Sequence, residues 1–197
     1  IIKRMIEKDH TIVLAMSGAM TPADFGVSCI IPLIKAGFID IITTTGANLY
    51  HDLQRQESDN WYEVHPNQGD VKLRKAGWTR IYDTGFPEDD LWETDNLVVD
   101  LVRRPDFARQ MTTTEFHYLL GRHLARYGNR RFKRADLNRS ILVQAYRNAI
   151  PIFCGAPQDG SIFLNLAFLK RKLGHRYKFG INLEDDIHEF GSYHYFA

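Results

Sequence analysis

The sequence predicts an α/β protein with a Rossmann-like open parallel sheet flanked by helices. Two observations lead to this prediction. Short apolar runs alternate with segments of helical periodicity, which is typical of parallel strands joined by right-handed crossovers. In addition, several strand ends carry small and hydroxyl residues directly before a helix. A chain of 197 residues suits one domain with a sizeable core, or part of a larger one, and we expect a single domain over residues 1–197.

The first strand and the helix after it have clear sequence boundaries. Residues 11–16 form an apolar run short enough for a buried strand. We expect the next helix to begin with Thr21 as its N-cap and Pro22 at its first position. Apolar side chains recur at helical spacing, and Gly37 predicts the end of this helix. Residues 38–44 predict the second strand.

The other elements are predicted from caps, periodicity and turn residues. Thr112 and Glu115 have the spacing of a capping box, and Ser140 is a further N-cap. Because the last helix reaches Ala197 without a stop signal, we expect the natural protein to continue beyond it. The expected elements are a helix over 49–56, a loop over 62–69, a helix over 70–76, a strand over 79–82, a helix over 86–103, helices after 112 and 140, a strand over 150–154, a helix over 162–173, a strand over 177–181 and a helix from 184 onward.

The composition argues against several classes of protein. Lys and Arg total 25 against 24 Asp and Glu, so no strong overall charge would attract nucleic acid or a membrane surface. The basic run over residues 130–134 is interpreted as a solvated loop. Cys29 and Cys154 lie far apart and form no CxxC pair, which argues against a disulfide framework or a zinc site. No apolar run approaches the roughly 20 residues that cross a bilayer, so we expect a cytoplasmic protein without a bound metal.

Three strand ends predict a ligand crevice. The turns over residues 16–19, 44–47 and 158–161 each place small and hydroxyl residues before a helix. In an open parallel sheet, ligands bind outside the carboxyl ends of the strands. Small residues let backbone amides approach a phosphate, and helix N-termini favour negative charge. The pattern indicates a dinucleotide site, although ordinary strand-to-helix turns remain the alternative because the chain has no GxGxxG motif.

His51 is the candidate for proton transfer. Asp52 follows it directly, and a neighbouring carboxylate raises the pKa of a histidine and orients its ring. The alternative is a histidine on the surface of a helix. We expect the side chains of His117, His123 and His175 to lie on exposed faces of the protein.

Three long segments resemble the deoxyhypusine synthase family. They cover residues 12–20, 38–53 and 150–161, and their order and spacing match across essentially the whole chain. The run from Thr45 to Leu53, Thr-Gly-Ala-Asn-Leu-Tyr-His-Asp-Leu, is similar to the bacterial, deoxyhypusine synthase-like branch of that family. The resemblance implies a transferase that uses NAD and passes the aminobutyl group of spermidine through an enzyme lysine to an amine acceptor. It also implies a homotetramer.

The resemblance assigns cofactor contacts to residues of the three turns. A first loop after the first strand and a second loop after the second strand would contact NAD. An acidic residue after the third core strand would bind ribose hydroxyl groups. The residues implied are Ser17, Gly18 and Thr21 in the first loop, Thr45, Gly46 and Ala47 in the second, and Asp159 as the acid.

The chain departs from the family pattern in the region that binds the amine. Eukaryotic members carry paired glutamates where this chain has Tyr50 and His51, and an aspartate near Leu164 and Asn165. The resemblance therefore places substrate contacts at Tyr50, His51 and Asn165 but implies a different recognition of the amine. Because successive helical side chains are turned by about 100°, we expect His51 to face the substrate and Asp52 to face the scaffold.

The functional alternatives differ in the acceptor and in whether catalysis occurs. No lysine of the chain matches the catalytic position, which we expect beyond Ala197. The altered amine site favours a small polyamine acceptor, with homospermidine formed from spermidine and putrescine. The alternatives are deoxyhypusine formation on a protein lysine and a non-catalytic NAD-binding homologue.

Overall fold

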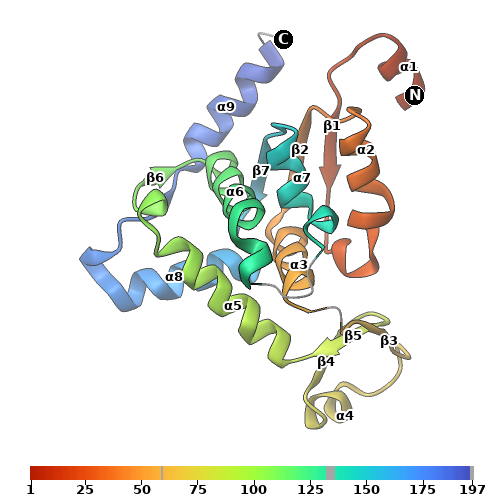
Figure 1. Cartoon of the computed structure of the whole chain (residues 1–197), viewed down its shortest axis with the longest axis vertical. Coiled ribbons are helices and arrows are strands. Elements are labelled where there is room, and N and C mark those ends of the chain that lie inside the picture. The colour runs from red at the N-terminus through yellow and green to blue at the C-terminus, as the bar shows by residue number, and fades with distance from the viewer. Residues whose placement is uncertain (59, 132–135, 196–197) are drawn as a thin grey trace.

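The centre of the protein is a parallel sheet. The computed structural model describes residues 1–58, 60–131 and 136–195 (Figure 1). Strands β1 (Val13–Met16), β2 (Ile41–Thr45) and β7 (Ile152–Ala156) form a three-stranded parallel sheet in the order β1-β2-β7. The predicted core strands are therefore confirmed as parallel neighbours, with β2 in the middle.

A layer of helices covers one face of this sheet. Helix α7 (Ile141–Arg147) lies between α2 (Ile31–Lys35) and α6 (Thr113–Arg131) and packs against both. The apolar side chains at the start of α7 are almost completely buried and share one core cluster with Ile42 of β2. Each such side chain contributes roughly 1.5–3 kcal/mol by leaving water. The core therefore lies between this helical layer and the sheet.

The remaining long helices surround the carboxyl ends of the strands and the outer strand β7. Helix α3 (Gly46–Glu57) packs against α5 (Asp89–Val102), α7 and α8 (Ser161–Leu173). Helix α9 (Leu183–Tyr195) reaches β7 through Phe190, whose ring lies 5.2 Å from that of Phe153. The short elements are α1 (Ile2–Glu7) and the 3-10 turns Pro105–Phe107, Leu137–Arg139 and Gly174–Arg176.

A small antiparallel lobe follows α3. Strands β3 (Tyr62–Glu63), β5 (Thr84–Pro87) and β4 (Trp78–Ile81) pair in that order, and α4 (Asp70–Lys75) packs beside them (Figure 1). The sequence predicted α4 and β4 but gave a continuous loop over 62–69 and a helix from residue 86. Both predictions were wrong at those points. Strands of two to four residues are too short to show an alternating pattern.

The strand predicted over residues 177–181 does not belong to the core sheet. It is reduced to β8 (Gly180–Ile181), which pairs in parallel with β6 (Gln110–Met111). This pair forms a separate two-stranded sheet.

The predicted helix after β1 is interrupted. Residues Thr21–Ala23 form a 3-10 turn, Asp24 has a left-handed backbone with φ of 61°, and a π-helix over Gly26–Ile30 precedes α2. Thr21 therefore lies inside a turn and is not an N-cap. A side chain on Gly26 would come within 3.2 Å of Ile141 Cδ1, so this irregular stretch packs closely on α7.

The predicted caps at Thr112 and Ser140 are confirmed, unlike the one at Thr21. Thr112 N donates to Glu115 Oε2 at 3.1 Å, and Glu115 N donates to Thr112 Oγ1 at 3.2 Å, which is a complete capping box. Ser140 Oγ accepts from Val143 N at 3.2 Å at the start of α7. Gly37, with φ of 70°, follows the end of α2 as expected.

Asp52 faces the scaffold, as predicted. Its carboxylate accepts hydrogen bonds from Ser140 Oγ at 2.8 Å, Ile141 N at 2.7 Å and Leu142 N at 3.0 Å. Burial raises its pKa to about 6, and these three donors act in the opposite direction. Asp52 therefore joins the middle of α3 to the first turn of α7.

His117 and His123 do not lie on exposed faces, whereas His175 does. Only 1% of His117 and 7% of His123 is exposed, because His117 faces β7 and His123 faces the turn Pro105–Phe107. Nδ1 of His117 donates to the carbonyl of Ile152 at 3.0 Å, and burial lowers the pKa of His117 to about 4.

The stability of the protein should fall in acid because of His117. Its pKa in the fold lies below the unfolded value of about 6.5, so the stabilisation is complete above pH 6.5 and is lost as the pH falls toward 4. The largest loss from this group is about 3 kcal/mol. We expect His117→Gln, which keeps an N–H for the Ile152 carbonyl, to flatten the pH dependence of the unfolding free energy between pH 6.5 and 4. In urea titrations the exposed His175→Gln should follow the wild type; a His117→Gln slope equal to the wild-type slope would contradict the assignment.

Candidate functional site

Three loops meet at the carboxyl edge of the sheet. They follow β1, β2 and β7, and all three strands run in the same direction. Thr45 Oγ1 donates to the carbonyl of Gly18 at 2.6 Å, which joins the first loop to the second. The backbone of Asp159 lies beside Gly46, which joins the second loop to the third. The prediction that Asp159 lies at the same edge as the other two loops is therefore confirmed.

The second and third loops touch through two glycines. A Cβ atom on Gly160 would overlap the backbone of Gly46 and lie 2.6 Å from Ala47 N. A Cβ atom on Gly46 would lie 3.0 Å from the carbonyl oxygen of Pro157. Both positions require glycine because two backbones approach closely there. Gly18 is a glycine for a different reason, since its φ is 62° and the space around its Cα is open.

Asn48 holds the first loop in place. Its Oδ1 accepts hydrogen bonds from Met20 N at 2.7 Å and from Thr21 N at 3.3 Å. Its Nδ2 donates to Thr44 Oγ1 and Thr45 Oγ1, both at 3.2 Å. The residue is completely buried. Sequence reasoning did not select it, although it directly follows the Thr-Gly-Ala turn and is a polar residue in the first turn of a helix.

Arg55 supports the same loop from further along α3. Its guanidinium donates to the carbonyl oxygens of Thr21 at 3.1 Å and Pro22 at 2.7 Å, and pairs with Asp24 at 3.1 Å. Thr21 itself is buried, and its hydroxyl donates to the carbonyl of Asn48 at 2.8 Å. The Thr21 side chain thus faces α3, and its contact with a cofactor stays a prediction.

The other predicted cofactor residues differ in exposure, and Gly46 is buried. Ser17, Gly18 and Asp159 are exposed, whereas Thr45 and Ala47 are half-buried. The edge therefore combines accessible backbone of small residues with one exposed carboxylate. This combination suits the phosphate and ribose groups of a dinucleotide.

Two of the predicted substrate residues converge on an acid that sequence reasoning missed. The hydroxyl of Tyr50 donates to Asp95 Oδ1 at 2.9 Å and lies 3.2 Å from the carbonyl oxygen of Leu91. Nδ2 of Asn165 donates to the same Asp95 oxygen at 2.7 Å and to the Ser161 carbonyl at 2.9 Å. Burial, and then the charge of Asp95, holds the pKa of Tyr50 far above its usual range.

A sequence signal for Asp95 exists. It lies four residues after Leu91 and three before Val98, so it stands in the apolar stripe of α5. An acidic residue in such a stripe needs a polar partner, and partners at positions 50 and 165 cannot be found by local spacing.

His51 lies in an aromatic pocket. Only 9% of the residue is exposed, and its ring packs edge-on against Tyr50, Trp61 and Phe86. Nδ1 lies 2.7 Å from Gln54 Oε1. Burial lowers the pKa of His51, which favours the neutral imidazole. This arrangement leaves little of the ring open to a ligand, and the role of His51 in amine binding or proton transfer stays a prediction.

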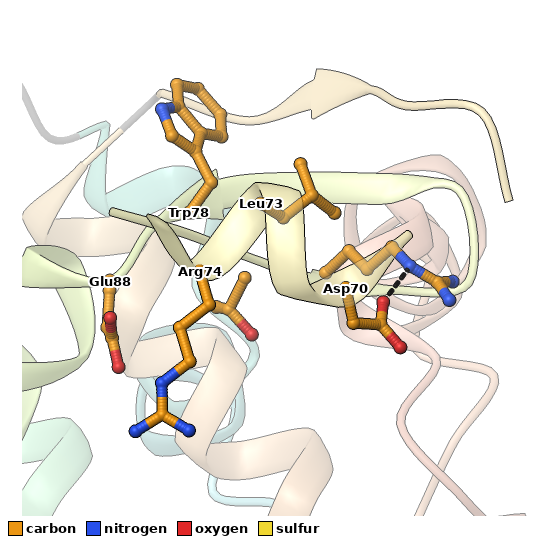
Figure 2. A pocket seen from close by; sticks show the side chains of 7 residues that line it. Asp70, Leu73, Arg74, Trp78 and Glu88 are labelled. Carbon is orange, nitrogen blue, oxygen red and sulfur yellow. Dashed lines mark hydrogen bonds and ion pairs between the residues drawn. The ribbon is translucent and has the colours of Figure 1, made fainter. Parts of the chain in front are cut away.

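A large hollow lies elsewhere, on the antiparallel lobe. It measures about 560 Å³, and Figure 2 shows the ion pair between Arg80 and Asp70, at 2.7 Å, on its wall. It shares no residue with the strand-end loops, and we do not assign it to the candidate site. The residues that line it are Asp70, Leu73, Arg74, Trp78, Thr79, Arg80 and Glu88.

The described ranges contain neither a metal cluster nor a membrane-spanning helix. No three His, Cys, Asp or Glu side chains among residues 1–58, 60–131 and 136–195 are grouped as a metal site requires. None of the helices in those ranges is long and apolar enough to cross a membrane. The basic run over 130–134 was predicted to be a loop, but Arg130 and Arg131 belong to α6; residues 132–134 lie outside the described residues.

Known proteins match this chain along almost its whole length. The family model described as deoxyhypusine synthase matches residues 1–197. A deoxyhypusine synthase-like protein of Thermosynechococcus vestitus is 38% identical over 195 residues, which are 99% of this chain and 47% of that protein. A deoxyhypusine synthase-like protein of Cyanothece sp. is 42% identical over 170 residues, which are 85% of this chain and 41% of that protein. These matches confirm the resemblance found in the sequence.

A solved structure supports the fold. The crystal structure of a candidate deoxyhypusine synthase from Entamoeba histolytica has a TM-score of 0.59 at 17% sequence identity, and the match covers 92% of this chain and 52% of that one. At this identity the likeness shows the fold alone. The chain spans about half the length of the relatives it matches.

The contact between the glycine loops can be tested by adding one methyl group. We expect Gly160→Ala to lower the unfolding free energy by about 1–3 kcal/mol, because the Cβ overlaps backbone that has no room to move. Gly155→Ala is the matched control, since nothing lies within 4 Å of its Cβ position. Urea denaturation measures both, and equal stability of the two variants would contradict the proposed contact.

The role of Asn48 can be tested by hydrogen exchange. Asn48→Ala leaves the amides of Met20 and Thr21 without their acceptor, so we expect both to exchange roughly tenfold faster or more. Asn182→Ala removes another asparagine cap, at the start of α9, and should leave these two amides unchanged. Unaltered exchange in Asn48→Ala would show that the loop is held in another way.

Proposed function

The chain belongs to the deoxyhypusine synthase family, and on this basis we propose that its full-length protein transfers the aminobutyl group of spermidine to an amine acceptor, with NAD as the cofactor. The favoured acceptor is a small polyamine, putrescine, which would give homospermidine. The observation that carries the proposal is the meeting of three small-residue loops at the carboxyl edge of a parallel sheet.

The three loops would bind NAD at the carboxyl ends of the parallel strands, as in a Rossmann-like sheet. When bound, NAD would accept and return the hydride that this transfer requires. The exposed backbone of Ser17 and Gly18 would approach the phosphates, and Gly46 and Ala47 would form the second wall. The carboxylate of Asp159 would accept hydrogen bonds from ribose hydroxyl groups. Residues 1–197 would thus act as one NAD-binding domain.

The residues predicted to contact the amine favour a small acceptor. The two positions that carry glutamates in eukaryotic members hold Tyr50 and His51 here. The pKa of Tyr50 is raised and that of His51 is lowered, so both are neutral near pH 7. Asn165 is a third neutral group. With fewer fixed charges, the site would hold a polycation less firmly and would release a small product more easily.

Other parts of the proposal rest on the family resemblance alone. They are the catalytic lysine beyond Ala197, which must be neutral to attack a carbon centre, and the homotetrameric assembly. The cytoplasmic location expected from the sequence is also part of the proposal.

Mass spectrometry of the reaction decides the function. We expect the full-length protein, incubated with spermidine, putrescine and NAD, to produce homospermidine. Asp159→Asn should weaken NAD binding by roughly tenfold, because it removes a charged acceptor of hydrogen bonds. Glu184→Gln, which neutralises an exposed acid on α9, is the matched control and should not change it.

Each other outcome has its own meaning. Aminobutyl transfer to a protein lysine, without homospermidine, would replace the small acceptor by a protein. NAD binding without any transfer would indicate a non-catalytic homologue.

A further inference from the structure

Asp95 is an acid whose charge has no counter-ion in the described part of the chain. It is half-buried on α5. Both groups that donate to it are neutral, the phenol of Tyr50 and the amide of Asn165, and both donate to Oδ1. Among residues 1–58, 60–131 and 136–195, no Lys, Arg or His forms an ion pair with Asp95, and no hydrogen bond reaches its Oδ2. Oδ2 of this carboxylate therefore keeps its capacity to accept a charge-assisted hydrogen bond from a cationic ligand.

Exposed apolar side chains on the two helices that carry Asp95 and Asn165 favour one kind of cation. Trp92 lies one helical turn before it on α5, and Leu164 and Phe168 lie on either side of Asn165 on α8. All three side chains are large, apolar and more than half exposed. An aromatic face and a carboxylate together favour an organic ammonium. A metal ion would need further acidic or imidazole ligands, and no such group was found in the described ranges. The chemistry fits a primary ammonium carried on a methylene chain.

The position of Asp95 connects it with the cofactor loops. Helices α3 and α8 begin at Gly46 and just after Gly160, the two glycines whose backbones touch. Tyr50 and Asn165 lie about one turn into their helices, roughly 6 Å along each axis. Helix α5 packs against both helices (Figure 1), and the hydrogen bonds from Tyr50 and Asn165 place Asp95 between them. A chain of a few methylene groups anchored at Asp95 would therefore reach toward the crevice.

We propose that Asp95 is the carboxylate that binds a terminal ammonium group of the polyamine substrate. The inference rests on the proposed function and deepens it, because it supplies the fixed negative charge that Tyr50 and His51 lack. Tyr50 and Asn165 then act as positioning residues. They hold Oδ1 and leave Oδ2 to receive the ammonium.

Calorimetry with the full-length protein tests this assignment. Spermidine is titrated into wild type, Asp95→Asn, Asp95→Glu and Glu93→Gln. We expect Asp95→Asn to weaken spermidine binding by about 10-fold to 100-fold, the range for loss of a charge-assisted hydrogen bond. Asp95→Glu keeps the charge and should recover part of the loss. Glu93→Gln removes an exposed acid two positions away on the same helix and should change affinity by no more than about twofold.

Two further measurements distinguish a role of Asp95 in ligand binding from a structural role. NAD affinity should be equal in all four proteins, since Asp95 does not belong to the cofactor loops. Spermidine affinity should fall less steeply with salt in Asp95→Asn than in wild type, because one charge pair is gone.

Three results would overturn the assignment in distinguishable ways. If Asp95→Asn binds spermidine as wild type does, Asp95 is not the anchor, and the proposed function stands. If Asp95→Asn loses NAD affinity as well, or changes the oligomeric state in sedimentation, Asp95 supports the fold or a subunit contact. If wild type binds no spermidine, both this assignment and the proposed function fail.

Discussion

The arrangement of the site depends on the burial of polar side chains along α3. Asn48 and Arg55 both bond to the segment after β1, Tyr50 bonds to α5, and Asp52 bonds to α7. A buried polar group without its partner costs about 1–3 kcal/mol. Each of these three elements must therefore lie where it can satisfy the polar side chains of α3. The many polar side chains of α3 would make it an unlikely core helix, yet the loops of the crevice are fixed to it.

The sequence predicted the fold where the signal was local. The apolar runs of β1, β2 and β7 are short enough to predict strands, and the caps at Thr112 and Ser140 are recognised within four residues. Prediction failed where packing overrides local preference. Pro22 favours a helix start, yet the chain turns at Asp24 and continues as a π-helix because Gly26 packs on α7. The strands of the lobe pair with one another and are too short for a pattern.

The same limit applies to the candidate site. The loops could be predicted because small residues after a strand have a direct chemical meaning. The roles of Asn48 and Asp95 could not be predicted, because both depend on hydrogen bonds to residues far away in sequence. Tyr50 and Asn165 were selected by resemblance, and the structure adds that they share one carboxylate oxygen, 45 and 70 positions away. His51 was selected by its neighbour Asp52, but the two side chains point into different environments.

The link between Asp52 and α7 has a consequence for synthesis on the ribosome. Asp52 is made 88 residues before the serine hydroxyl that donates to it. The second edge of β2 likewise stays unpaired until Ile152 and the rest of β7 have been synthesised. Until then the nascent chain carries an unpaired strand edge and a helix with unsatisfied polar groups, which are the features that make partly made proteins prone to aggregate. Contacts this distant along the chain also close slowly, so the N-terminal half gains its final structure only when the third core strand has emerged.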